Sequence, residues 1–541
     1  MCALENIMHP TLFIGLDGAT FTILNPLMAN GTMPFLREFV KEGVRADLMS
    51  TSNPLTPPAW VSLITGRTPG NHGVFDFIWA EERKSDHYFT LYNFRDIQCE
   101  TIWSIVSRQQ GKVCSLNFPL MSPPPKVRGT IVPGLVSWKH IRRNVHPADL
   151  YEKLKTIPGF NAKELAWDFD LEKKAERGIP EEEYEHWIDY HIRRERLWFE
   201  IARKLMQDDP ADLMAVLFDG PDKISHMGYR FLDPAIFPPH PSSWEKKMRD
   251  LCINFFHELD GFLAELVALA GPDSRVVMAS DHGFGPSREV FRVNTWLQQM
   301  GYLTWKTIDH LEGKEKLDAQ KVIDRHFVLL EWDKTTAYAR TATSNGIYIR
   351  VADKPGDTGV PRKDYGAFRD RLMGELRQVK DPKSGEPVIK KIRTREEAFP
   401  GAHNGQAPDL LLVMRDHSFI SILNKEPVVY PRPYVEGTHY PAGIFLARGP
   451  GIQKGKTVSP FPIQDVASSL LYSLGLDIPG DFEGRLPAEV FEPAFLAARP
   501  VNIGEPTVAV NADLAGAEKV QLTEDEEKEI YEQFKALGYV E

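Results

Sequence analysis

The sequence predicts an α/β fold built on a mostly parallel central sheet. Short, largely apolar runs recur along the chain, and such runs are typical of strands that are buried on both faces of a parallel sheet. Stretches with helical patterning separate these runs, as they do in βαβ units. Several of the runs end on acidic residues, and in such sheets the functional residues gather beyond the carboxyl ends of the strands.

Five apolar runs are predicted as strands, in chain order 11–16, 211–218, 275–280, 409–414 and 443–447. Helical patterning between them is most marked over 180–206 and 244–269. Three runs lead into acidic residues, the first into Asp17, the second into Asp219 and Asp222, and the third into Asp281 and its neighbour His282. We therefore expect these side chains to meet at one edge of the sheet.

Residues 50–77 contain a short predicted helix that begins close to Thr56. Thr56 is predicted to be its N-cap, because the hydroxyl can accept a bond from the backbone N–H groups of the first turn. Pro57 suits the first helical position, and Gly66 is expected to end the helix in a left-handed conformation. A threonine here lies where a helix N-terminus attracts anions. An ordinary N-cap ahead of a buried helix explains the same residues, so the rest of the chain must decide between the two interpretations.

The composition narrows the classes of function. The chain has 541 residues, of which 64 are basic and 75 acidic, so its formal net charge is −11. This balance argues against a general nucleic-acid-binding protein, which would have a basic face, but it allows a small anionic substrate held by metal ions. The four cysteines are scattered, so we expect neither a disulfide framework nor a thiolate metal site.

A cytoplasmic location is expected. The first residues lack the basic segment of a signal peptide, and no apolar run is long enough to span a bilayer. We expect a catalytic domain over 1–500 and a tail with a terminal helix over 501–541. Within the domain, 78–205 and 303–405 are expected to be excursions from the sheet, and either is in a position to cover the site as a cap.

Residues with metal-ligating side chains occur at four places near predicted strand ends. Asp222 and His226 lie four residues apart, which on a helical turn places both on one face. The other three places hold Asp17, the pair Asp281 and His282, and His439. Taken singly, such residues are explained as turn, cap or surface residues. Their joint occurrence favours a metal site, and carboxylate with imidazole ligands suits Zn or Mn.

The sequence resembles the alkaline phosphatase superfamily, in the branch of the type I phosphodiesterases and nucleotide pyrophosphatases, and most of all its bacterial predicted phosphohydrolases/phosphomutases. The matching pieces occur in the family's order and cover most of the predicted sheet. They are Gly-Leu-Asp17-Gly, Leu-Thr56-Pro-Pro-Ala-Trp with Thr65-Gly66 and His72-Gly73, Pro-Asp222-Lys-Ile-Ser-His226, Ser-Asp281-His282-Gly283 and Gly-Thr-His439. The resemblance implies a three-layer α/β sandwich with inserted cap segments.

The resemblance also implies a hydrolase that acts on phosphoric esters with two bound divalent ions, with Zn expected and Mn as the alternative. One ion would be held by Asp222, His226 and His439, and the other by Asp17, Asp281 and His282. Thr56 would reach toward the second ion and attack a phosphate mono- or diester, forming a phosphothreonine that water then clears. The chemistry agrees, because a threonine hydroxyl is a poor nucleophile unless a metal lowers its pKa.

One departure from the family's pattern concerns the phosphate. The phosphodiesterase branch has an asparagine shortly after the nucleophile that helps to hold a phosphate oxygen, and neither Ala59 nor Trp60 can play that part. Asn53 and Arg67 are candidates for it, although a structural or solvated role is favoured for both. The Cys/Ser-x-Pro-x-Arg signature of the sulfatases is absent, which argues against a formylglycine sulfatase.

Four further residues are weaker candidates. For His72, a structural role is at least as well supported as a position near the site. Asp219 is either a partner of a ligand histidine or a turn residue. Asn345 and Tyr348 begin a predicted strand over 343–351 and are taken as packing residues, with a place facing the pocket as the alternative.

Two alternatives to a hydrolase stay open. A phosphomutase of the same superfamily would return the phosphoryl group from Thr56 to another hydroxyl of the bound molecule, provided that a cap excludes water. A non-catalytic binding protein would keep the fold without turnover, although the intact ligand set argues against it. The expected partner is a small phosphorylated substrate, with neither nucleic acid nor membrane, and the sequence predicts no oligomeric state.

Overall fold

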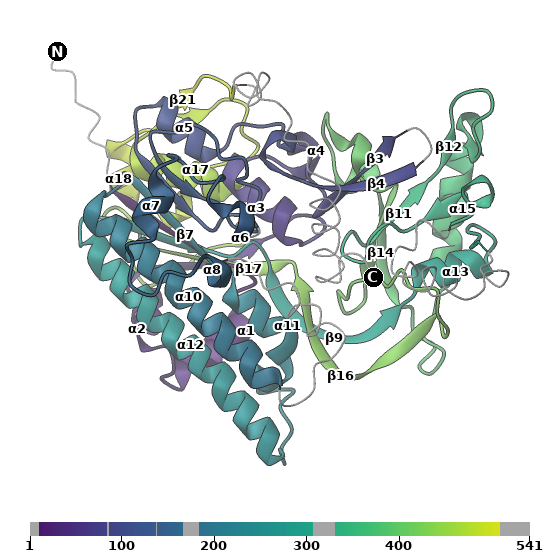
Figure 1. Cartoon of the computed structure of the whole chain (residues 1–541), viewed down its shortest axis with the longest axis horizontal. Helices are drawn as coiled ribbons and strands as arrows, with labels where there is room; N and C mark the ends of the chain where they lie inside the picture. The colour runs from purple at the N-terminus through teal and green to yellow at the C-terminus, as the bar shows by residue number, and fades with distance from the viewer. Residues whose placement is uncertain (1–9, 84–85, 137, 166–182, 307–329, 509–541) are drawn as a thin grey trace.

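The computed structural model describes residues 10–83, 86–136, 138–165, 183–306 and 330–508. These residues form two lobes that are joined by a long antiparallel ribbon (Figure 1). The larger lobe contains the central sheet and most of the helices, and the smaller lobe contains a second sheet. Among the described helices, none is both long enough and apolar enough to cross a lipid bilayer.

Nine strands of the described residues form the central sheet. The middle of the sheet consists of three parallel strands, β1 (Thr11–Leu16), β7 (Leu213–Phe218) and β8 (Arg275–Ala279). Beyond β7 lie two more parallel strands, β5 (Val113–Leu116) and β6 (Gly129–Val132). Beyond β8 lie the antiparallel β17 (Ala442–Arg448), then β2 (Val44–Met49) with β18 (Lys456–Thr457) and β19 (Phe461–Pro462). The prediction of a mostly parallel sheet is confirmed.

Helices cover both faces of this sheet. Side chains of β1 alternate between the two faces, so this strand contributes to the core on each side. Leu12, Ile14 and Leu16 contribute to one core. The helices in that core include α1 (Phe21–Ala29), α2 (Pro34–Glu42), α10 (Glu183–Asp208) and α12 (Ser243–Ala270). Phe13 contributes to the opposite core, which contains α3 (Thr56–Thr65), α5 (Ile102–Arg108) and α17 (Asp465–Leu474). The layers confirm the predicted three-layer sandwich and explain why the run 11–16 is largely apolar and buried on both faces.

The two longest described helices match the two predicted most clearly. α12 begins with a capping box, in which the Ser242 hydroxyl accepts from the Glu245 N–H at 3.1 Å and the Glu245 carboxylate accepts from the Ser242 N–H at 2.7 Å. Phe199 of α10 stacks on Phe262 of α12 with 4.8 Å between ring centroids. Their apolar stripes therefore face each other above the sheet.

Two expectations about the sheet are wrong. The run 409–414 forms β15 (Leu410–Met414), which belongs to the antiparallel sheet of the smaller lobe. The run 443–447 lies in the central sheet as β17, antiparallel to both its neighbours, a direction that the sequence did not predict. The segment 78–205 is not wholly an excursion, because it supplies β5 and β6. Apolar character indicates that a strand is buried, but not which strand it pairs with or in which direction.

The smaller lobe is built around its own core. Its sheet has the order β10 (Ala337–Tyr338), β11 (Gly346–Ile349), β15 and β14 (Ile389–Thr394). The helices α13 (Val293–Gln299) and α15 (Tyr365–Leu376) pack on this sheet. The strand predicted over 343–351 corresponds to β11, and the described strands of 303–405 all lie in this lobe.

The ribbon between the lobes pairs β9 (Gly283–Phe291) with β16 (Val429–Tyr440). β9 begins directly after His282, and β16 ends on His439 and Tyr440, just before β17. In the register of the pair, His439 lies opposite Phe284 and Tyr440 opposite Gly283. The ribbon therefore fixes both histidines at the end that meets the central sheet.

The predicted terminal helix lies outside the described residues, which end at 508. The first part of the predicted tail pairs with the larger lobe through β20 (Ile478–Pro479) and β21 (Ile503–Gly504). The division of the chain at residue 500 stays a prediction.

We expect Phe118→Ala to lower the free energy of unfolding by about 3–5 kcal/mol. Phe118 is fully buried, with its ring centroid 5.6 Å from Phe13, 5.5 Å from Trp60 and 5.1 Å from Trp103. Denaturant unfolding monitored by tryptophan fluorescence measures the change. Leu269→Ala is the control, because Leu269 on α12 is 38% exposed. Equal stability of the two variants would contradict the packing described for this face.

Candidate active site

At the carboxyl edge of the central sheet, the structure brings together the acidic and histidine residues that the sequence singled out. They follow β1 and β8 directly, or lie on α11 (Gly220–Leu232), which begins just after β7. His439 reaches the same edge from the opposite direction, because β17, which it precedes, is antiparallel to β8. The first group is Asp17, Asp281 and His282, and the second is Asp222, His226 and His439.

The first group is buried. His282 Nε2 lies 3.2 Å from Asp281 Oδ2 and 3.6 Å from Asp17 Oδ1. Hydrogen bonds hold the other oxygen of each carboxylate. The Trp60 indole N–H donates to Asp17 Oδ2 at 3.0 Å, and the Gly18 N–H donates to Asp281 Oδ1 at 3.2 Å. One oxygen of each carboxylate is thereby left facing the histidine.

The second group adjoins the first. Asp222 Oδ1 lies 3.2 Å from His439 Nε2 and 3.4 Å from His226 Nε2, and these two nitrogens are 3.0 Å apart. The spacing of four on α11 places Asp222 and His226 on one face of the helix, as predicted. His282 joins the two groups, because its Nε2 is 3.9 Å from Asp222 Oδ1 and its ring stacks on that of His439 at 3.6 Å.

Backbone carbonyls set the protonation of two of these histidines. His439 Nδ1 lies 2.9 Å from the Pro54 carbonyl oxygen, and His282 Nδ1 lies 3.1 Å from the Gly283 carbonyl oxygen. A carbonyl oxygen only accepts, so each Nδ1 carries the proton and each Nε2 keeps a free lone pair. Such a contact on the far nitrogen orients an imidazole as a metal ligand.

Burial perturbs the titration of this cluster. Burial, reinforced by repulsion from Asp281 and Asp222, raises the pKa of Asp17 well above its usual value. Burial and Asp222 raise the pKa of Asp281 in the same way. Burial also acts to raise the pKa of Asp222, but attraction to His226 and Lys223 outweighs it and holds this pKa well below the usual value.

The cluster fits divalent cations. Three buried carboxylate oxygens, Asp17 Oδ1, Asp222 Oδ1 and Asp281 Oδ2, have no hydrogen-bond partner among the described residues. Buried carboxylates require a counter-charge, and in the described part of the chain Lys223 Nζ, 3.3 Å from Asp222 Oδ2, is the ammonium group at this cluster. Oxygen and imidazole ligands without thiolate suit Zn or Mn. Each group is thus able to hold one metal ion.

Thr56 lies beside the first group, with its Oγ1 3.4 Å from His282 Nε2. The prediction that Thr56 is the N-cap of α3 is wrong by one residue, because Leu55 is the N-cap and Thr56 is the first helical residue. Gly66 ends the helix in the left-handed conformation, with a φ of 65°, as predicted.

The two prolines after Thr56 explain the shift. Pro57 and Pro58 have no N–H, so a capping hydroxyl at residue 56 would find few donors. The first helical bond runs instead from the Ala59 N–H to the Leu55 carbonyl at 3.0 Å. The Thr56 hydroxyl is left for the cluster, and its own N–H is the one amide donor that the first three helical residues can offer an anion.

Sequence reasoning missed two side chains that contact the cluster. The ring of Trp60 packs on Phe118, and its N–H also binds Asp17. Its place one turn after Thr56 was the available signal. Lys223 was passed over although it is next to Asp222, since an adjacent lysine is ordinarily solvated.

His72 and Asp219 have structural partners. His72 is buried, its Nε2 lies 2.9 Å from Ser62 Oγ, and burial lowers its pKa to about 3. Asp219, the N-cap residue of α11, forms an ion pair with the buried Arg194. His72 therefore supports α3, and Asp219 anchors the start of the helix that carries Asp222.

Arg67 and Tyr348 are also packing or structural residues. Arg67 forms an ion pair with Asp481 at 2.6 Å, which agrees with the structural role favoured for it. Tyr348 is buried and stacks on Tyr338 with 5.8 Å between ring centroids. Neither side chain belongs to the two groups.

Comparisons with known proteins bear on the family and the fold. The family model for type I phosphodiesterases/nucleotide pyrophosphatases matches residues 11–441. Among curated proteins, no match was found. Phosphonoacetate hydrolase from Sinorhizobium meliloti 1021, solved with phosphonoformate, has a TM-score of 0.51 at 15% identity, over 86% of this chain and 95% of that chain. Murine ectonucleotide pyrophosphatase/phosphodiesterase 5, solved in an inactive form with AMP, has a TM-score of 0.49 at 15% identity, over 86% and 95% of the two chains.

We expect Asp281→Asn to stabilise the protein after divalent ions are stripped with a chelator, by about 1–3 kcal/mol at pH 7. The amide keeps an acceptor for the Gly18 N–H but removes one of the mutually repelling carboxylates. Because the pKa of Asp281 is raised in the folded protein, the wild type loses stability as pH rises from the usual value of 3.8 toward the raised one. The advantage of the variant should therefore grow with pH over that window.

Denaturant unfolding of the stripped proteins at pH 5 and pH 7 measures this difference. Asp273→Asn is the matched control, because Asp273 is exposed and its replacement should change stability by at most about 0.5 kcal/mol. A less stable Asp281→Asn protein at pH 7 would show that these carboxylates do not repel one another.

Proposed function

Because the chain belongs to the type I phosphodiesterase/nucleotide pyrophosphatase family, and so is a hydrolase of phosphoric esters, we propose that it cleaves a small phosphate mono- or diester through a phosphothreonine at Thr56. Two divalent ions are proposed to bind at the two groups, with Zn as the first expectation and Mn as the alternative. The observation that carries this proposal is the position of the Thr56 hydroxyl beside one group while the second group adjoins it.

Hydrogen bonds from outside the two groups hold four of the six proposed metal ligands. Asp17, Asp281 and His282 would hold one ion, and Asp222, His226 and His439 the other. When bound, the ions supply positive charge that lowers the pKa of a nearby hydroxyl and neutralises phosphoryl oxygens. The contacts of Trp60, Gly18 and the two backbone carbonyls keep the ligand atoms directed inward.

Thr56 is proposed to act twice in the reaction. Its Oγ1 releases its proton and attacks phosphorus, a bond forms between them, and the bond to the leaving oxygen breaks. The leaving oxygen takes up the released proton, so that the leaving group departs as an alcohol. Water then attacks the phosphothreonine, releasing the phosphate product and restoring the hydroxyl. The rigid start of α3 positions the nucleophile, and the Thr56 N–H is available to a phosphoryl oxygen.

Thr56→Ala is expected to lower turnover by about 1000-fold or more, because it removes the nucleophile, while metal content stays near that of the wild type. The measurement is the release of phenol from phenyl phosphate and from diphenyl phosphate. Thr56→Ser should keep measurable activity, since it keeps the hydroxyl.

Thr65→Ala is the control for α3. Thr65 lies at the other end of the same helix, where its hydroxyl donates to the Val61 carbonyl at 2.6 Å. This variant should keep its activity. A Thr56→Ala protein with most of its activity would exclude Thr56 as the nucleophile.

His439→Ala is expected to lower the metal content from about two ions per chain to about one, because it removes one imidazole from the second group. Elemental analysis of the purified protein measures the content and identifies the metal. His403→Ala is the control, because His403 is an exposed histidine outside both groups. A wild-type protein that takes up no metal even after reconstitution would overturn the proposed mechanism.

A further inference from the structure

A cavity of about 260 Å³ lies beside the candidate active site. One wall is the segment 49–54, which leads directly to Thr56, and another is the end of β15 in the smaller lobe. Pro54 and His439 also line it, and these are the residues joined by the bond that orients the His439 ring. The cavity and the proposed metal centre therefore share a wall.

Arg393 brings a positive charge to this cavity. It lies on β14, and its Nη1 donates to Ser52 Oγ at 3.0 Å. Its Nε is buried without a hydrogen-bond partner, and no carboxylate of the described residues lies within ion-pair distance of its guanidinium. Burial, with Lys390 contributing, lowers the pKa of His417, another lining residue, so that Arg393 is not joined by a second charge at neutral pH.

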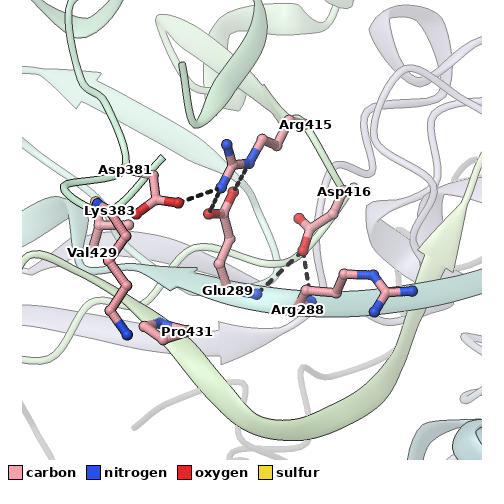
Figure 2. A pocket seen from close by; sticks show the side chains of 8 residues that line it. All are labelled: Arg288, Glu289, Asp381, Lys383, Arg415, Asp416, Val429 and Pro431. Atoms are coloured by element: carbon pink, nitrogen blue, oxygen red, sulfur yellow. Dashed lines mark hydrogen bonds and ion pairs between the residues drawn. The ribbon is translucent and has the colours of Figure 1, made fainter. Parts of the chain in front are cut away.

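A second cavity contains an arginine whose charge is neutralised by carboxylates. This cavity, of about 410 Å³, is lined by residues of the ribbon and of the smaller lobe, among them Arg415. Figure 2 shows Arg415 between two carboxylates, with its Nε 2.6 Å from Glu289 Oε1 and its Nη2 3.1 Å from Asp381 Oδ2. An anion entering there would meet a guanidinium that is already paired. Arg393 has a serine hydroxyl and no carboxylate as its partner, so its charge stays available to an anion in the first cavity.

The remaining polar groups of the first cavity complement this charge. Asn53 is 2% exposed, and its Nδ2 donates to the Thr343 carbonyl at 2.9 Å. Because that carbonyl only accepts, the amide orientation is set, and Asn53 Oδ1 is left buried without a partner. Ser50 Oγ is buried and unpartnered as well. Donors and a free acceptor thus line one side of the space.

We propose that this cavity binds a second anionic group on the substrate, a carboxylate or a phosphate attached to the organic part of the phosphoester. Arg393 and the Ser52 hydroxyl contact the anion, and Asn53 Oδ1 accepts from a neighbouring hydroxyl of the substrate. The proposal rests on the proposed function, because it places the scissile phosphate at Thr56. It names the substrate class as small phosphoesters that carry a further negative charge.

The test compares alkyl phosphates that differ at the end remote from the ester. Each chain, with one, two or three methylene groups, carries a carboxylate, a phosphate or an uncharged hydroxymethyl group. At the best chain length, the wild type should favour a charged ester by about 10- to 100-fold in kcat/KM. In Arg393→Ala this ratio should fall close to one. A ratio is used because any general loss of folding or metal affects both esters equally.

Lys391→Ala is the matched control, because Lys391 is an exposed cation on the same strand and does not line the cavity. It should keep the wild-type ratio. A wild type with no preference at any length would overturn the proposal, as would a preference that survives Arg393→Ala. A third outcome would also overturn the proposal. If free succinate changes the hydrolysis rate of the uncharged esters through Arg393, and the wild type does not prefer the charged esters, the site binds a separate anion and not a group of the substrate. Hydrolysis of the uncharged esters tests the proposed function itself. A failure of the proposed function is therefore distinguishable from a failure of the proposed anion site.

Discussion

Three aspartates buried against one another are the constraint on which this structure depends. Asp17 and Asp281 resist ionisation beside Asp222, and their raised pKa values reflect it. The sheet nevertheless prevents their separation, because β1 pairs with both β7 and β8, and Gly15 lies opposite Leu217 and Ala279. Gly18, with a φ of 66°, turns the chain after Asp17 at a point where a Cβ would lie 2.7 Å from the Phe284 ring. The repulsion that weakens the folded chain also strengthens its affinity for divalent cations, which relieve it.

The smaller lobe takes part in this arrangement through the ribbon. β9 leaves the cluster at Gly283 and β16 returns to it at Tyr440, so the two strands that support the lobe also bracket His282 and His439. A movement of the ribbon would therefore move two imidazoles. The cavity beside His439 lies at the same junction, with residues from both lobes in its walls. The proposed substrate pocket and the proposed metal centre thus share the same structural support.

The residues of the site were more predictable than the sheet that carries them. A ligand that directly follows an apolar run, such as Asp17 or Asp281, needs only the rule that parallel strands end at one edge. Strand partners depend on contacts distant in sequence, so the direction of β17 and the place of β15 were missed. β5 and β6 have only four residues each, too few to stand out by apolar character. The prediction of the N-cap of α3 failed for a local reason, because the two prolines after Thr56 lack the N–H groups that a capping hydroxyl needs. The Trp60 contact to Asp17 depends on tertiary packing that periodicity does not encode.

The segment 50–56 connects the cavity wall, the orientation of the His439 ring and the position of Thr56. Its start is tied to the sheet by the Ser50 N–H, which donates to the Pro441 carbonyl at 2.8 Å. Asn53 faces the cavity, the Pro54 carbonyl orients the His439 ring, and Thr56 presents its hydroxyl to His282. A displacement of this short loop would change the imidazole orientation, the nucleophile position and the cavity wall together. The absence of an asparagine after Thr56 then has a physical counterpart, because the proposed polar contacts to the substrate come from residues that precede the proposed nucleophile. The structure thus favours recognition from the smaller-lobe side of Thr56, where Arg393 lies, over recognition from within α3.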